Sequence, residues 1–257
     1  MSDISAAFEL RKKYKHFRVL VIGRANAGKT TLLKRVCNTT EDLCIYDEGN
    51  NNLLEPTHGR GIHDIRRPFK FASNPGFLFH DSAGFEAGDE SQLKDVQNFI
   101  AERAKATEVG DQLHAIWFCF TPDIARPLLE LEKRFFNEER PKNVPVVAVF
   151  TKFDDLITQI YDDEKDDDEN LQVAKSELEK KFQEPLYGYM FPPRAHVCME
   201  DLHDDAGNHQ DQVKELTKQT ANSLDDLALK LLFVSVQQNN LELCIGYAVK
   251  QYLFMVV

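Results

Sequence analysis

Residues 17–33 read FRVLVIGRANAGKTTLL and join three patterns without a break. Phe17 to Ile22 form a nearly continuous apolar run, which predicts a strand buried on both faces. A loop bounded by Gly23 and Gly28 follows, and a helical pattern is expected over residues 29–37. The stretch therefore predicts a buried strand, a glycine-bounded loop and a helix in immediate succession.

The loop itself, GRANAGKT at residues 23–30, matches G-x-x-x-x-G-K-[ST]. Its glycines let the backbone wrap closely around phosphate oxygens, with successive N–H groups pointing inward as an anion nest. The helix that starts at Lys29 adds the positive end of its dipole. In such a loop the lysine reaches the β- and γ-phosphates, and the Thr30 hydroxyl ligates Mg²⁺. The residues expected to hold the nucleotide here are Asn26, Ala27, Gly28, Lys29, Thr30 and Thr31.

The rest of the chain alternates between strand and helix patterns. Strands are expected at residues 17–23, 62–72, 76–81, 113–120, 144–151, 195–199 and 231–236. Helices are expected at 29–37, 91–106, 124–140, 171–182, 211–224 and 241–253, and residues 44–61 are expected to be loop-like. The turn signal SNPG at residues 73–76 predicts an antiparallel hairpin. The fold class is therefore α/β, with a mostly parallel sheet, one antiparallel edge strand and helices on both faces. We expect a single domain over residues 1–257, with an insertion at about 155–225.

Composition and charge exclude several classes of protein. The formal net charge of −11 argues against non-specific binding of nucleic acid and against docking on anionic lipid. The five cysteines are scattered without a C-x-x-C pair, so neither a disulfide framework nor a zinc site is expected, and a reducing cytoplasm fits best. No signal peptide or transmembrane segment is expected, since the apolar stretch at 243–257 is too short to span a bilayer.

Two further motifs each follow a predicted buried strand. Asp81-Ser-Ala-Gly84 has the form D-x-x-G, and Thr151-Lys-Phe-Asp154 has the form [NT]-K-x-D. A carboxylate at Asp154 can accept hydrogen bonds from guanine N1–H and N2–H₂. Adenine lacks that donor pair and would leave the carboxylate unsatisfied. The sequence thus predicts guanine specificity, with the stem of Lys152 packed over the base.

In this order, the three motifs resemble those of the translation-factor-related class of P-loop GTPases, with its Era-like, septin-like and dynamin-like G domains. The form G-R-x-N-x-G-K-[ST] is closest to the Era-like group, and a looser resemblance is to a family of stand-alone fungal G domains. The resemblance covers residues 17–151. It implies a Mg²⁺-dependent molecular switch that binds GTP and GDP and hydrolyses GTP, with an unidentified protein effector. It also implies that Asp81 holds Mg²⁺ through water and that the Gly84 N–H meets the γ-phosphate.

The same resemblance predicts two less distinct elements. Thr57, in EPTHGRGIHDI, is expected to bind Mg²⁺ and sense the γ-phosphate. A backbone segment should also cap the guanine. Ser235 and Val236, at the end of the predicted strand LLFVSV, are the first candidates, and the rival is Met199-Glu200.

Phe85 stands where Ras-like enzymes carry the glutamine that orients the attacking water. Three replacements remain open: a monovalent cation such as K⁺ held by Asn26, the arginine Arg60 acting from the same chain, or a second copy docked across the nucleotide. His58, His80 and Glu86 are further candidates for positioning water. Two other functions remain as alternatives: a GTP-dependent assembly module with negligible turnover, and a P-loop kinase, which the TKFD motif disfavours.

Overall fold

The computed structural model of this chain describes residues 16–40, 44–46, 53–54, 64–82, 84, 90–205, 207 and 209–236. For residues 44–46, 53–54, 228 and 235 it describes the backbone only. The expected helix at 241–253 lies outside these residues.

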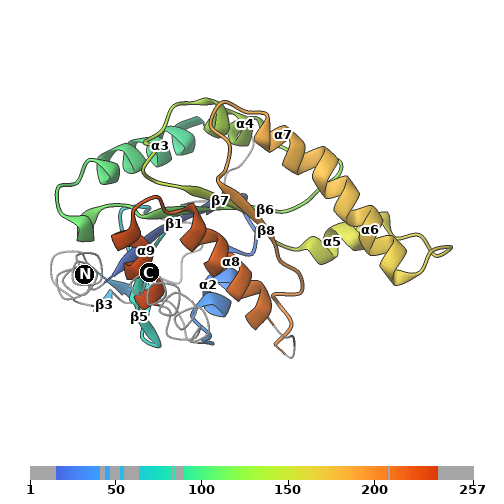
Figure 1. Cartoon of the computed structure of the whole chain (residues 1–257), viewed down its shortest axis with the longest axis horizontal. Coiled ribbons are helices and arrows are strands. Elements are labelled where there is room, and N and C mark those ends of the chain that lie inside the picture. Colours follow the sequence, from blue (N-terminus) through green and yellow to red (C-terminus); the bar gives the residue numbers. More distant parts are fainter. Residues whose placement is uncertain are drawn as a thin grey trace, which may run out of the picture.

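A single mixed sheet organises the described part of the chain (Figure 1). Its strands are β1 (Phe17–Gly23), β2 (Cys44–Tyr46), β3 (Leu53–Leu54), β4 (Phe69–Phe71), β5 (Asn74–Asp81), β6 (Ala115–Phe120), β7 (Val146–Phe150) and β8 (Ala195–Cys198). They lie in the order β3-β2-β4-β5-β1-β6-β7-β8. Strands β5, β1, β6, β7 and β8 run parallel, whereas β4, β2 and β3 extend the β5 edge in antiparallel fashion.

The predicted fold class is confirmed, and so is the β4–β5 hairpin. The antiparallel edge is wider than expected, because β2 and β3 lie within the segment predicted to be loop. Such short strands satisfy backbone groups that β4 would otherwise expose along its free edge. Strands β2 and β3 have only three and two residues, too few to show an alternation of apolar and polar residues in the sequence.

Helices cover both faces of the sheet (Figure 1). They are α2 (Lys29–Val36), α3 (Glu90–Ala104), α4 (Glu130–Asn137), α5 (Phe153–Ile160), α6 (Asp167–Leu178), α7 (Glu184–Tyr187), α8 (Gln210–Ser223) and α9 (Leu227–Ser235), with a 3₁₀ turn at Val109–Asp111 and a π-helical turn at Glu179–Gln183. Alternate residues of β1 point to opposite sides. Val19 and Val21 join a core with α2, α8 and α9, while Leu20 and Ile22 join a core with α3 to α7.

The strand expected at 231–236 is wrong, because residues 231–235 belong to helix α9 and Val236 is its C-cap. The Asp226 side chain caps this helix by accepting a hydrogen bond from the Leu229 N–H at 2.9 Å. Phe233 then packs on Phe17 with ring centroids 4.6 Å apart. A short apolar run is compatible with either a buried strand or a buried helix, and here the N-cap lies upstream of the run.

The helix expected at 124–140 is shorter, since α4 begins at Glu130. Pro127 disfavours helical backbone at the residue before it. Asp123 also forms a local turn, with its carboxylate accepting from the Ala125 N–H at 2.9 Å. The segment before α4 is therefore a loop that reaches towards the end of β1.

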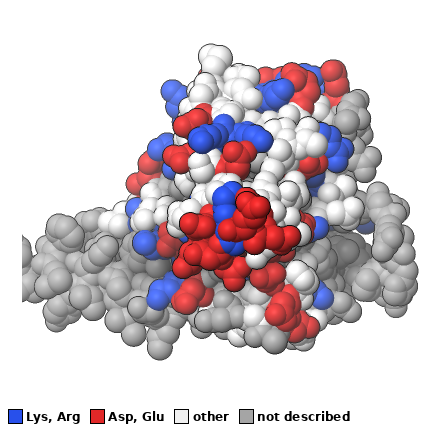
Figure 2. Space-filling model, turned by 90° about the vertical axis from the view of Figure 1, so that its right-hand side faces the viewer, with Lys and Arg blue, Asp and Glu red and all other residues white. Residues whose placement is uncertain are grey.

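The segment expected to be an insertion, at about 155–225, contains elements of the sheet and its covering layer. Strand β8 pairs with β7, and α8 packs on the sheet beside α2. Helices α5, α6 and α7 connect β7 to β8, and an insertion within this segment stays a prediction. The acidic run at 162–169 spans the turn after α5 and the first turn of α6, where Asp166 is the N-cap, and Figure 2 shows a red cluster facing the viewer at this position.

Candidate nucleotide site

The glycine-bounded loop, hereafter the P-loop (residues 23–30), lies between the end of β1 and the start of α2. Asn26 and Gly28 both adopt left-handed backbone, with φ of 60° and 66°. Asparagine and glycine are the residues that accept this conformation most readily. Lys29 Nζ lies over the loop and donates to the Arg24 carbonyl at 3.0 Å. The loop thus has the turned backbone and the overlying ammonium that phosphate binding requires.

The D-x-x-G motif packs directly against the P-loop. Asp81 ends β5 beside Val21 of β1, and the Ser82 N–H donates to the Val21 carbonyl at 3.2 Å. A Cβ atom at Gly84 would lie 2.3 Å from the backbone nitrogen of Ala25, so only glycine fits at this contact. The second motif is therefore held within backbone contact of the first.

Lys29 and Asp81 both act electrostatically on the buried thiol of Cys119, at the end of β6. Burial raises the pKa of this thiol to about 12, the Lys29 charge lowers it and the Asp81 charge raises it. Both charges therefore lie near the same strand end. A threonine hydroxyl and an aspartate carboxylate are oxygen ligands of the kind that Mg²⁺ prefers, so Thr30 and Asp81 fit a magnesium site.

Thr151 joins the third motif to the P-loop. Its buried hydroxyl donates to the Ala27 carbonyl at 2.8 Å and lies 3.1 Å from the Phe120 carbonyl. Lys152 follows in left-handed backbone, with φ of 55°, and leads into α5. This turn places Asp154 in the first turn of α5, at the same edge of the sheet as the P-loop.

The segment after β8 meets the TKFD motif. Asp154 Oδ1 accepts a hydrogen bond from the Asp201 N–H at 3.0 Å, and the Phe153 N–H donates to the Met199 carbonyl at 2.9 Å. Asp201 has a φ of 51°, a tight turn beside the carboxylate. Residues 199–201 therefore lie directly against Asp154, at the same end of the sheet as the P-loop.

Ser235 and Val236 are far from this segment. Val236 packs against Gly76, where an added Cβ would lie 2.8 Å from the Val236 Cβ. Gly76 lies near the start of β5, whereas the P-loop lies at the carboxyl ends of the parallel strands. The expectation that these two residues cap the guanine is wrong. The predicted strand that would carry them is a helix, and it ends beside the amino ends of the parallel strands rather than their carboxyl ends.

An ion pair that sequence reasoning missed ties the P-loop to α4. Arg24 Nε and Nη2 donate to the two carboxylate oxygens of Glu132 at 2.8 and 2.9 Å. The Glu132 side chain is fully buried, and its Oε2 also accepts from the Leu129 N–H at 2.7 Å. The same arginine donates to the carbonyls of Arg126 and Pro127. The only signal in the sequence is a glutamate at the third helical position, which is one half of a capping box; Leu129 at the N-cap has no side-chain oxygen to supply the other half.

Replacing Glu132 with glutamine is expected to destabilise the protein by about 3 kcal/mol, because it leaves the Arg24 charge without its buried partner. Nucleotide affinity should fall about tenfold, since the P-loop loses its anchor on α4. Thermal unfolding and titration with a fluorescent GDP analogue measure the two effects. Glu130→Gln, an exposed position on the same helix, is the matched control. Equal behaviour of the two variants would contradict the anchoring role.

His80, a candidate for positioning water, is engaged elsewhere. Arg18 Nη1 lies 2.9 Å from its Nε2, and since arginine only donates, this nitrogen accepts. The other nitrogen, Nδ1, donates to the Ile65 carbonyl at 2.7 Å. Burial, followed by the Arg18 charge, lowers the pKa of His80 to about 3. The ring is thus a neutral buried bridge, with no nitrogen available for water.

Five of the expected residues lie outside the residues that the structure describes: Thr57, His58, Arg60, Phe85 and Glu86. Asn26 is exposed on the P-loop, and Thr31 follows Lys29 and Thr30 in the first turn of α2.

A comparison with known protein families identifies a match over the segment that contains the P-loop and the D-x-x-G motif. The family model described as 50S ribosome-binding GTPase matches residues 18–152, a little over half of the chain. The chain therefore belongs to this GTPase family and is a GTP-binding P-loop G domain. No curated protein matches it. No helix in the described ranges is long and apolar enough to cross a membrane.

Among solved structures, the chain is similar to a mutant S. thermophilus NFeoB bound to GDP. The identity is 14% and the TM-score 0.42, over 81% of this chain and 63% of that one. The chain thus spans less than two thirds of that structure.

Proposed function

We propose that this chain hydrolyses GTP to GDP and phosphate in a Mg²⁺-dependent reaction and acts as a molecular switch. The observation that carries the proposal is the hydrogen bond from Thr151 Oγ1 to the Ala27 carbonyl. It joins the base-recognition motif to the phosphate loop, so one nucleotide can contact both.

Each motif has a separate task in this proposal. The P-loop N–H groups and Lys29 hold the phosphates, and Asp154 reads the guanine edge. Thr30, Asp81 and Thr57 would hold Mg²⁺, which neutralises charge on the phosphate oxygens. Met199 and Glu200, rather than Ser235 and Val236, are proposed to cap the base.

Phe85 stands in place of the catalytic glutamine, and we consider three groups that would take over the role of that glutamine in hydrolysis. A potassium ion at Asn26 is supported by the residue's exposed, left-handed position on the P-loop. Arg60 would act from the same chain, and a homodimer across the nucleotide would supply a group from the second copy. Any of these would stabilise the negative charge that develops on the phosphates in the transition state.

Partners and location follow from the same features. We propose GTP and GDP as ligands, an unidentified protein effector, and no nucleic acid as partner. Cys37, Cys119 and Cys198 form no disulfide with one another, which supports a reducing compartment such as the cytoplasm. Release of the γ-phosphate would free the segments after β5 and before β4, the usual form of a GTPase switch.

The test is the rate of phosphate release from GTP over a range of protein concentrations, in KCl and separately in NaCl. We expect Mg²⁺-dependent turnover. A rise in specific activity with concentration would assign the missing group to a second copy, and a need for K⁺ would assign it to Asn26. A flat, salt-indifferent rate would assign it to Arg60. Absence of turnover under all conditions would contradict hydrolysis and favour a GTP-held assembly module.

A further inference from the structure

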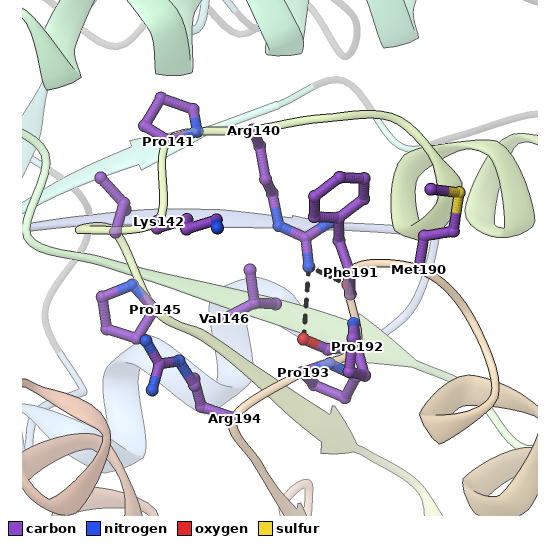
Figure 3. Close-up of a pocket in the computed structure, with 11 residues that line it drawn as sticks. Arg140, Pro141, Lys142, Pro145, Val146, Met190, Phe191, Pro192, Pro193 and Arg194 are labelled. Carbon is purple, nitrogen blue, oxygen red and sulfur yellow. Dashed lines mark hydrogen bonds between the residues drawn. The ribbon is translucent and has the colours of Figure 1, made fainter.

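A cavity lies at the amino ends of the parallel strands, at the opposite end of the sheet from the nucleotide site. It encloses about 240 Å³ beside the start of β7 and the segment that leads into β8. Figure 3 shows the side chains around it, which include Arg140, Lys142, Pro145, Phe191, Pro193 and Arg194. No residue assigned to GTP contributes to this cavity.

Arg140 is a half-buried cation in this cavity without a carboxylate partner among the described residues. Its guanidinium donates to the backbone carbonyls of Phe135, Phe191 and Pro192 (Figure 3 shows the last two). It also lies 4.8 Å from the ring centre of Phe135 and 5.1 Å from that of Phe136. Carbonyls and rings orient the charge but do not neutralise it. Burial accordingly lowers the pKa of Arg140 to about 10, which still leaves it charged at neutral pH.

Lys142 adds a second unmatched positive charge. It is exposed at the rim, and no described residue forms an ion pair with it. Arg194, across the cavity, is already paired with Asp225 at 2.9 Å. On a chain with a net charge of −11, these two cations form no ion pair with any described residue. A bound anion would supply both with a counter-charge.

The walls are apolar and stiff. Pro141, Pro145, Pro192 and Pro193 line the cavity together with the Phe191 ring (Figure 3). Proline fixes its own backbone, so this shape is largely preformed and little ordering is needed on binding. The volume is below the range of roughly 300–1,000 Å³ for drug-sized ligands. It suits a group about the size of one amino-acid residue.

We propose that this cavity binds a carboxylate attached to a compact apolar group. The carboxylate lies between Arg140 and Lys142, and the apolar group packs on Phe191 and Pro193. The same chemistry occurs in a free organic acid and in an acidic residue of a polypeptide. The inference is independent of GTP hydrolysis, because the cavity and the nucleotide site share no residue.

Methyl NMR of the full chain with labelled methionines tests the proposal, since Met190 lines the cavity with 75% of its surface exposed. The probes are N-acetylphenylalanine, its uncharged amide, and the blocked tripeptide acetyl-Leu-Glu-Leu-amide. We expect the Met190 signal to shift with at least one acid and not with the amide, with GDP present or absent. Binding of N-acetylphenylalanine points to a free acid, and binding of the tripeptide alone points to a polypeptide.

Two variants connect the shift to the cations. Lys142→Gln, at an exposed site, should weaken the affinity about threefold, the size expected for an exposed ion pair. Lys105→Gln, exposed and outside the cavity, should leave it unchanged. Arg140→Lys keeps the charge but loses the planar fork and should weaken binding about tenfold. Equal shifts with the acid and its amide, no shift with either acid, or an unchanged affinity in Lys142→Gln would overturn the proposal.

Discussion

Lys29→Ala is expected to lower the affinity for GTP by at least about 100-fold and to abolish turnover. The Lys29 ammonium lies over the P-loop, 3.0 Å from the Arg24 carbonyl, where it can reach the phosphates. A charge-assisted hydrogen bond to phosphate contributes roughly 1.5–3 kcal/mol, and the lysine is proposed to contact two phosphates. Competition against a fluorescent GDP analogue measures the affinity, and phosphate release measures turnover.

Lys34→Ala is the matched control for this variant. Lys34 lies in the same helix, α2, one turn further from the P-loop, where its Nζ donates to the Thr40 carbonyl. It should retain normal affinity and turnover. GTP hydrolysis at the normal rate by Lys29→Ala, with the fold confirmed by circular dichroism, would refute the P-loop assignment.

Asp154→Asn is expected to exchange guanine preference for xanthine preference. The carboxylate is proposed to accept from guanine N1–H and N2–H₂, and losing the second acceptor contact should cost about 100-fold in GTP affinity. Xanthine carries an oxygen where guanine carries the amino group, and an asparagine NH₂ can donate to it. The Oδ1 atom of asparagine can still accept from the Asp201 N–H, so the local turn should persist.

Competition between GDP and xanthosine diphosphate measures the exchange. Asp155→Asn is the matched control, because Asp155 is the next residue of α5 and is exposed. It should keep guanine preference. An unchanged GDP affinity in Asp154→Asn would exclude this residue as the determinant of base specificity.

The sequence predicts the part of the site that consists of motifs at the ends of buried strands. Thr30, Asp81 and Asp154 each follow or end a buried apolar run, and parallel strands bring their carboxyl ends to one edge. The local pattern therefore predicts that these three residues lie close together, although they are far apart in the chain. The contacts between motifs, such as Thr151 to Ala27, could not be read from spacing.

The failures have a common physical origin in tertiary contacts. Glu132 reads as an ordinary charged residue of a surface helix, yet packing of α4 buries it against Arg24. The apolar run before Ser235 fits a strand or a helix equally well by pattern. The helix is favoured by the Asp226 N-cap and by the packing of Phe233 on Phe17. The strand expectation also places the guanine cap at Ser235, at the wrong end of the sheet, whereas the rival Met199-Glu200 lies beside Asp154.

The most direct test of GTP hydrolysis at the P-loop is phosphate release from GTP and from ATP, measured side by side with Mg²⁺ in KCl for the unaltered chain and for Lys29→Ala. We expect the unaltered chain to consume GTP and leave ATP intact, and Lys29→Ala to consume neither. Equal consumption of ATP would contradict guanine recognition by Asp154, and turnover by Lys29→Ala would contradict hydrolysis at the P-loop.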